Sequence, residues 1–215
     1  MTKRAREITL GAVATLLLLS LGSPAFAKKG ARISVGDDPS LKEGSPKLVL
    51  IEVSDFQCPY CMLSARDLMP KVYEGFVRTG KVELLFLDLP LQMHPHAFKA
   101  AEAAACAGDQ KQFWDMHHLL FSNHRALAPD RLSGYAKQLE LDVPAFEKCL
   151  SSGRHAAGIR EDMRIAENLG IRGTPAYLLG RRVPDSDKVE ILDIVKGLPP
   201  FESLKAKLDA LLTAQ

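Results

Sequence analysis

The sequence has few cysteines, little aromatic content and no strong excess of charge. Its 215 residues include four cysteines and one tryptophan, and the formal net charge is +2. Four cysteines are too few for a small scaffold held by disulfides, and near-neutral charge does not indicate nucleic-acid binding. The length suits one domain with a sizeable core, or a domain with an insertion.

The one long apolar run lies at the N-terminus. A basic segment precedes residues 8–21, and residues 25–27 read Ala-Phe-Ala, the small-x-small pattern of a cleavage site. We expect residues 1–27 to be a signal peptide that directs export to the periplasm, where disulfides form and persist. An uncleaved membrane anchor is the alternative, but the run is short for the ~20 residues that a spanning helix needs.

Hydrophobic patterns predict an α/β sheet interrupted by helices. Residues 28–46 are polar and rich in glycine and proline, which favours a lead-in segment with one short strand at 32–35. Residues 47–54 form a nearly continuous aliphatic run, typical of a strand covered on both faces. The other predicted elements are a helix that starts at the first cysteine and ends near Gly80, a strand at 81–87, helices at 97–106, 112–120, 129–139, 144–150 and 156–169, strands at 176–179 and 189–195, and a helix at 200–212.

This order gives a βαβ unit, a helical block and a ββα unit. A chain of this kind predicts an α/β sheet with helices on both faces. We therefore expect one domain at 47–215, with a helical insertion at about 95–170 between its two halves.

The chemistry-bearing motif is Cys58-Pro59-Tyr60-Cys61, directly after the buried strand. At a helix start, free N–H groups and the helix dipole favour the thiolate of Cys58. Cys61 lies one helical turn further on, as a resolving thiol would. A zinc half-site and an inert structural disulfide are the alternatives. A zinc site usually needs a second Cys/His pair at similar spacing, and Cys106 and Cys149 do not form one.

Two short motifs carry a family resemblance. Residues 56–61 read Phe-Gln-Cys-Pro-Tyr-Cys, and residues 173–175 read Gly-Thr-Pro before a late strand. Together they resemble the thioredoxin-fold proteins of the DsbA-like disulfide oxidoreductase family, over roughly residues 35–212. The segment 107–121 is similar to the group of that family that has a helical insertion.

The resemblance implies roles for several residues. It implies that Pro175 is cis and lies beside the cysteines, and that the backbone of Thr174 binds a client peptide as an added strand. It also places Pro59 and Tyr60 in the client-binding region. The position of Glu52 matches an acid that assists proton transfer at the resolving cysteine.

The pattern around Glu52 predicts burial, and a buried carboxylate should have a raised pKa. The alternative is an edge position with Glu52 facing water. For Cys106 and Cys149 a structural disulfide is the first interpretation, while buried free thiols or a second redox couple stay open. The six histidines do not have the spacing of a known ligand set, so we expect no metal.

We therefore expect a periplasmic dithiol oxidase that introduces disulfides into exported proteins with cysteines, as a monomer and without a dissociable cofactor. The resemblance implies a membrane quinone-linked partner that reoxidises it. A reductase or isomerase on the same fold is the first alternative. A Cys/His metal-binding module using Cys58, Cys61 and histidines is the second.

Overall fold

The computed structural model describes residues 29–36 and 38–214. The expected signal peptide, residues 1–27, lies outside the described residues. Within the described part of the chain, no helix is both long enough and apolar enough to cross a membrane.

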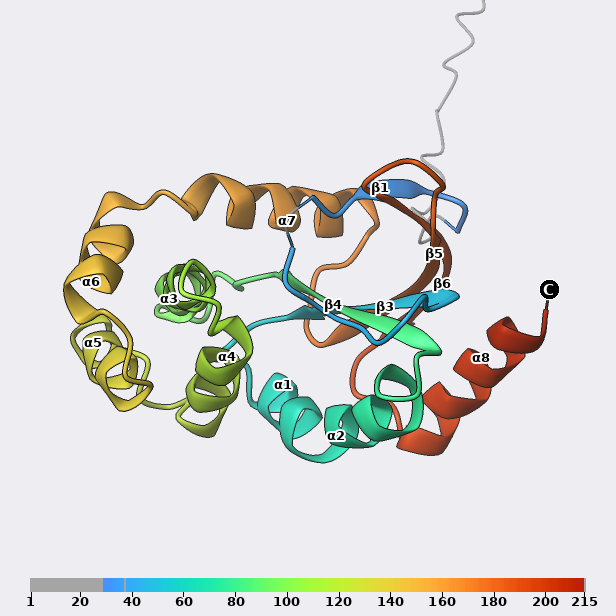
Figure 1. Ribbon diagram of the computed structural model, residues 1–215, viewed down its shortest axis with the longest axis horizontal. Coiled ribbons are helices and arrows are strands. Elements are labelled where there is room, and N and C mark those ends of the chain that lie inside the picture. The colour runs from blue at the N-terminus through green and yellow to red at the C-terminus, as the bar shows by residue number, and fades with distance from the viewer. Residues whose placement is uncertain (1–28, 37, 215) are drawn as a thin grey trace, which may run out of the picture.

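A six-stranded mixed sheet forms the centre of the molecule, in the order β1-β6-β5-β3-β4-β2 (Figure 1). The central strand β3 pairs with β4 in parallel and with β5 in antiparallel orientation. Every residue of β3 and β4 is buried, which explains why their sequences are almost continuously apolar. The strands are β1 (Arg32–Ser34), β2 (Ser40–Leu41), β3 (Leu48–Ser54), β4 (Val82–Asp88), β5 (Ala176–Arg182) and β6 (Lys188–Lys196).

The helical segment after β3 alternates between α-helical and π-helical turns. It runs through α1 (Pro59–Leu63), η1 (Ser64–Leu68), α2 (Met69–Val72) and η2 (Tyr73–Val77). Pro70 lies in the first turn of α2, where a missing N–H is tolerated. The other helices are α3 (Ala97–Gly108), α4 (Phe113–Ser122), α5 (Pro129–Gln138), α6 (Val143–Ser152), α7 (Ala156–Asn168) and α8 (Phe201–Thr213).

Helices cover both faces of the sheet, as Figure 1 shows, with α7 on one side and α1, α2 and α8 on the other. Side chains alternate between the two faces along β3. Leu48 and Leu50 pack with α2 and α8, whereas Val49 and Ile51 pack with α7. The same alternation directs Glu52 toward the face that carries the cysteine helix.

The helices α3 to α7 lie between β4 and β5 in sequence, and α3 to α6 lie beside the sheet in space (Figure 1). Buried side chains of α3 to α6 and Ile159 of α7 form a third core, which also includes Phe56 and both cysteines of the motif. The ring of Phe56 lies 5.2 Å from that of Phe86 and 4.9 Å from that of Phe121. Such pairs contribute about 0.5–1.5 kcal/mol each beyond burial, so they fix the segment before Cys58 against the insertion.

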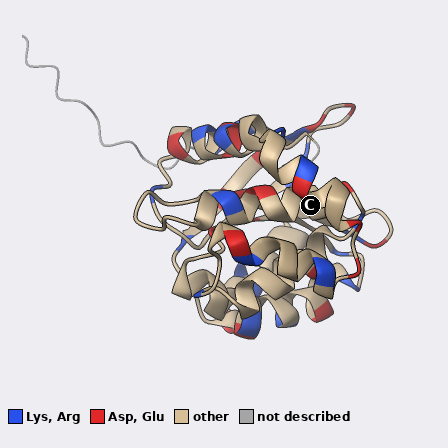
Figure 2. Ribbon diagram, turned by 90° about the vertical axis from the view of Figure 1, so that its left-hand side faces the viewer, with Lys and Arg blue, Asp and Glu red and all other residues tan. Residues whose placement is uncertain are grey.

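The observed element order agrees with the predicted βαβ, helical and ββα units. The strand β2 was not predicted; it has two residues and pairs with β4. Figure 2 views the molecule from the insertion side and shows acidic and basic residues interspersed over the helices, in keeping with the small net charge.

Candidate active site

Cys58 is the N-cap residue of α1 and lies just beyond the end of β3. Its backbone is extended, with φ −71° and ψ 124°, and Pro59 follows in the first turn, where its missing N–H costs nothing. The side chain is buried, whereas Pro59 and Tyr60 are exposed. The sulfur of Cys58 therefore lies at the edge of the core, next to a surface that another protein can reach.

Asp55 holds the turn between β3 and Cys58. Its carboxylate accepts hydrogen bonds from the N–H groups of Gln57 at 2.7 Å and Cys58 at 3.2 Å. On the other side it accepts from the N–H of Leu91 at 2.8 Å and contacts Nδ1 of His94 at 2.7 Å. Sequence reasoning missed Asp55, although an aspartate two residues before a turn N–H is the signature of an Asx-turn.

The pKa of the Cys58 thiol falls from its ordinary 9.0 to about 5, chiefly because the thiol of Cys61 donates a hydrogen bond to the thiolate. Burial opposes the shift, and hydrogen bonding to the side chain of Thr174 and to the N–H groups of Tyr60 and Cys61 adds to it. The N–H contributions are those expected for a sulfur at a helix start. At neutral pH the folded protein therefore holds Cys58 as a thiolate.

Cys61 has the opposite character. It is fully buried, and this burial raises the pKa of its thiol, as do the hydrogen bond to Cys58 and the negative charge there. Both cysteines are reduced in the structure. One sulfur is therefore an anion at the surface edge, and the other is a neutral thiol beneath it.

Glu52 lies in the interior, with 1 % of its surface exposed, so the alternative of an edge position is wrong. Burial raises its pKa from 4.5 to about 7, while hydrogen bonds from Ser64 and Ser54 limit the rise. The hydroxyl of Ser64 donates to Oε1 of Glu52 at 3.0 Å and lies 2.6 Å from the Tyr177 hydroxyl. Ser64 follows Cys61 by three residues, so this polar cluster lies under the cysteine helix.

Thr174 and Pro175 lie beside the cysteine pair, and the peptide bond between them is cis. The thiol of Cys58 contacts the carbonyl oxygen of Thr174 at 3.6 Å. Pro175 directly precedes β5, and its carbonyl accepts from the N–H of Gly197 at 2.9 Å. The structure thus brings the two distant motifs together.

Two large apolar side chains are exposed in this region. Tyr60, between the cysteines, is 61 % exposed, and Met93 is 77 % exposed. Met93 precedes His94, which the Asp55 carboxylate fixes next to the Cys58 turn. Tyr60 is thus exposed between the two cysteines, and Met93 is exposed next to a residue that contacts the Cys58 turn.

Cys106 on α3 and Cys149 on α6 form a disulfide, with their Cα atoms 5.9 Å apart. It closes a loop within the insertion and excludes buried free thiols in this state. Among the described residues, the one group of metal-ligating side chains lies here, with Asp109 and His155. Cys58 and Cys61 do not belong to it.

Buried titratable groups that sequence reasoning missed lie elsewhere in the core. The pKa of Asp88 is raised well above its ordinary value by burial and by nearby acids, and burial raises the pKa of Asp162 to about 7. Asp162 accepts from the N–H of Asp88 at 3.1 Å. The ring of His117 is buried among aromatic rings, so its pKa is well below its ordinary value.

The comparisons with known proteins agree with this geometry. A family model described as thioredoxin matches residues 41–194. The chain belongs to the thioredoxin family. The disulfide bond formation protein D of Bacillus subtilis is 23% identical over 185 residues, covering 82% of this chain and 78% of that protein.

Solved structures give the same fold. Oxidised BdbD from Bacillus subtilis has a TM-score of 0.73 at 20% identity, over 88% of this chain and 99% of that one. The alpha-DsbA1 protein of Wolbachia pipientis has a TM-score of 0.71 at 22% identity, over 82% and 91%. The predicted DsbA-like thioredoxin fold with a helical insertion is therefore confirmed.

A further set of relatives consists of longer proteins. The Na(+)/H(+) antiporter NhaA 1 of Salinispora arenicola is 39% identical over 147 residues, which are 67% of this chain and 22% of the antiporter. The chain thus spans about a fifth of the length of these relatives.

Proposed function

We propose that this protein is an exported dithiol oxidase that introduces disulfides into other exported proteins through Cys58 and Cys61. The observation that carries the proposal is the opposite ionisation of the two thiols, with a pKa of about 5 for Cys58 and a raised pKa for Cys61. The fold shared with BdbD and the name of the Bacillus subtilis relative support it.

The reaction begins with the Cys58–Cys61 disulfide. A client thiolate attacks the sulfur of Cys58, the bond to Cys61 breaks, and a mixed disulfide forms. Cys61 takes up a proton, for which Glu52, with a pKa of about 7, is our proposed donor. A second client thiolate then attacks the client sulfur and expels Cys58, which leaves readily because its thiolate is stable. The client gains a disulfide, and Cys58 and Cys61 are left reduced.

Client contact follows from the same geometry. Thr174 lies beside Cys58, and we propose that its backbone pairs with an extended client segment. The exposed side chains of Tyr60 and Met93 are our proposed apolar contacts for the client. Such contacts are independent of client sequence, which suits an enzyme that acts on many proteins.

The direction of electron flow is tested by the reduction potential of the Cys58–Cys61 couple. The protein is equilibrated with glutathione buffers of different redox ratio, and the reduced fraction of the peptide that contains Cys58 is quantified in each. Thioredoxin, with a cysteine pKa of about 7, has a potential of about −270 mV. A pKa lower by about 2 stabilises the reduced form further and makes the potential at pH 7 less negative by up to about 50 mV. A value at or below thioredoxin's would overturn the oxidase proposal in favour of a reductase.

The roles of the two sulfurs are tested by trapping. Cys61→Ser should accumulate a mixed disulfide when its Cys58 thiolate attacks a disulfide-bonded peptide, because no resolving thiol remains. Cys58→Ser should accumulate none, because Cys61 is fully buried and the pKa of its thiol is raised. The reverse pattern would contradict the assignment.

We further propose a periplasmic location after removal of residues 1–27, with reoxidation by a membrane quinone-linked partner. N-terminal sequencing of protein recovered from the periplasm should begin at Lys28. Recovery of the uncut chain in the membrane fraction would contradict the proposal, and loss of activity in the cell on removal of quinone would support the partner.

A further inference from the structure

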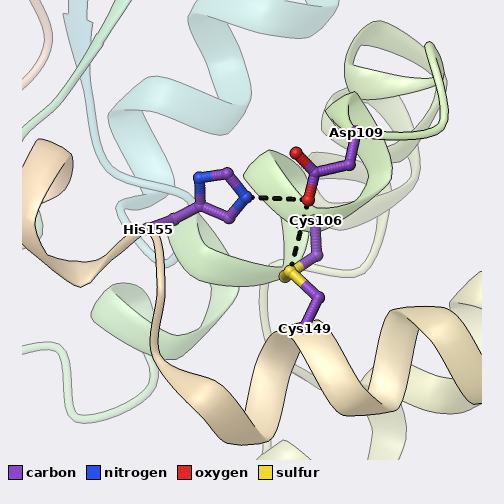
Figure 3. A group of neighbouring side chains, drawn as sticks. All are labelled: Cys106, Asp109, Cys149 and His155. Atoms are coloured by element: carbon purple, nitrogen blue, oxygen red, sulfur yellow. Dashed lines mark hydrogen bonds and ion pairs between the residues drawn. A yellow bond between two sulfur atoms is a disulfide. The ribbon is translucent and has the colours of Figure 1, made fainter.

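Four potential metal ligands converge where α3, α6 and α7 meet, away from the cysteine pair of α1. Cys106 and Asp109 lie three residues apart at the end of α3, and therefore on one side of that helix. Cys149 comes from α6, and His155 is the residue before α7. One donor atom from each of the four lies within 4.8 Å of the others, and Figure 3 shows them around the disulfide.

These donor types are those of a structural zinc site. Zinc binds sulfur at about 2.3 Å and nitrogen or carboxylate oxygen at about 2.0–2.2 Å in a tetrahedron, which places its ligand atoms about 3.3–3.8 Å apart. Nε2 of His155 already lies 2.8 Å from Oδ2 of Asp109, and that oxygen lies 3.4 Å from Sγ of Cys149. The two bonded sulfurs must move apart, which Cα atoms 5.9 Å apart allow through side-chain rotation. The contact between His155 and Asp109 must also lengthen by about 0.5 Å to reach the spacing of a tetrahedron.

We propose that reduction of the Cys106–Cys149 disulfide converts this cluster into a zinc site made by Cys106, Cys149, Asp109 and His155. A dithiol supplies two electrons and two protons, the sulfur–sulfur bond breaks, and the dithiol becomes a disulfide. Zn²⁺ then displaces the two thiol protons and binds both thiolates. His155 binds through neutral Nε2, and Asp109 exchanges its contact with His155 for one with the ion.

The charges around the cluster suit a divalent cation. Zn²⁺ with two thiolates and one carboxylate carries a net charge of −1. The guanidinium of Arg154 forms an ion pair with Asp109 and offsets that charge. Arg154 therefore acts as an outer partner that keeps the carboxylate ionised and oriented.

The cluster is closed on the sulfur side and open on the other. Both sulfurs are buried, whereas the side chains of Asp109 and His155 are 33% and 30% exposed. These two residues and Arg154 line a cavity of about 710 Å³, which gives a metal ion a path to the site. In the zinc-bound state α3 and α6 would stay cross-linked although the disulfide is broken.

The inference does not depend on Cys58 or Cys61, and the test removes both. The full chain with Cys58→Ser and Cys61→Ser is reduced with a phosphine, and zinc is titrated in competition with a chromophoric chelator. The reduced chain should bind one zinc ion, and the oxidised chain should bind none. Cobalt in place of zinc should give the spectrum of a tetrahedral site with two thiolates.

Two single variants separate a four-ligand site from binding by the thiols alone. Asp109→Asn and His155→Gln should each weaken zinc binding by about tenfold or more, since even outer partners contribute that much. His124→Gln, a histidine on the loop after α4, is the matched control and should bind as the parent does. Failure of the reduced chain to bind zinc, or equal affinity of all three variants, would overturn the proposal.

Discussion

Replacing Glu52 with glutamine should stabilise the protein at alkaline pH and hardly at all at acidic pH. Burial raises the pKa of Glu52 from 4.5 to about 7. Between these values the unfolded chain releases the proton and the folded chain keeps it, so stability falls as pH rises. Above pH 7 both states are ionised, and the loss is constant.

The size of the loss follows from the shift. A difference of about 2.5 pKa units corresponds to about 3 kcal/mol. The folded wild type should carry this cost near pH 8, and less than about 1 kcal/mol of it near pH 5. Glutamine has the same size and can still accept the hydrogen bond from Ser64, but it does not ionise.

The assay is urea unfolding of wild type and Glu52→Gln at both pH values. Both proteins are fully reduced, so the oxidation state of the four cysteines is the same in every measurement. The stability of the variant relative to wild type should rise by about 2 kcal/mol between pH 5 and pH 8. Glu147→Gln, on the exposed side of α6, is the control and should show no such rise. A difference for Glu52→Gln that does not vary with pH would refute the reasoning.

Two further substitutions test the parts that hold the site. The Cys106–Cys149 disulfide joins residues 43 positions apart, so Cys106→Ala/Cys149→Ala should lower the unfolding free energy by about 4 kcal/mol in the chain-entropy model. Peptide mapping without reductant should show the link between the two cysteines in the wild type. An unfolding free energy equal to that of the wild type would contradict a structural role for the disulfide. Asp55→Ala removes the acceptor of four hydrogen-bond donors around the Cys58 turn. The substitution should lower the unfolding free energy by about 2–3 kcal/mol, as measured by urea unfolding. It should also slow thiol exchange, as measured by the rate at which the protein reduces a model disulfide. An unchanged exchange rate would show that the turn forms without the Asp55 carboxylate.

Much of the fold could be predicted because its signals are local. The continuous apolar run of 47–54 indicated a doubly covered strand, found as β3 at 48–54. Five helices were expected in the insertion, and five are found at similar bounds. The two residues of β2 could not be predicted, because so short a segment has no period and its pairing with β4 depends on the folded sheet.

The site was harder to predict where partners are distant in sequence. The CxxC motif and Glu52 have signals within ten residues of each other. The contacts of Glu52 with Ser64 and of Ser64 with Tyr177 arise only when η1, β3 and β5 come together. His94 likewise reaches Asp55 across 39 positions, and Asp109 meets His155 across 46. Such contacts depend on how distant segments pack in the folded chain, and local sequence patterns do not reveal that packing.

The central claim is that the folded protein holds Cys58 as a thiolate at neutral pH. It is tested most directly by the pH dependence of Cys58 alkylation in the reduced chain. The rate itself is a poor guide, because a stabler thiolate is also a weaker nucleophile. The midpoint should lie near the pKa of about 5 that the Cys61 hydrogen bond and the helix N–H groups produce. A midpoint close to the ordinary 9.0 of a free thiol would contradict the account.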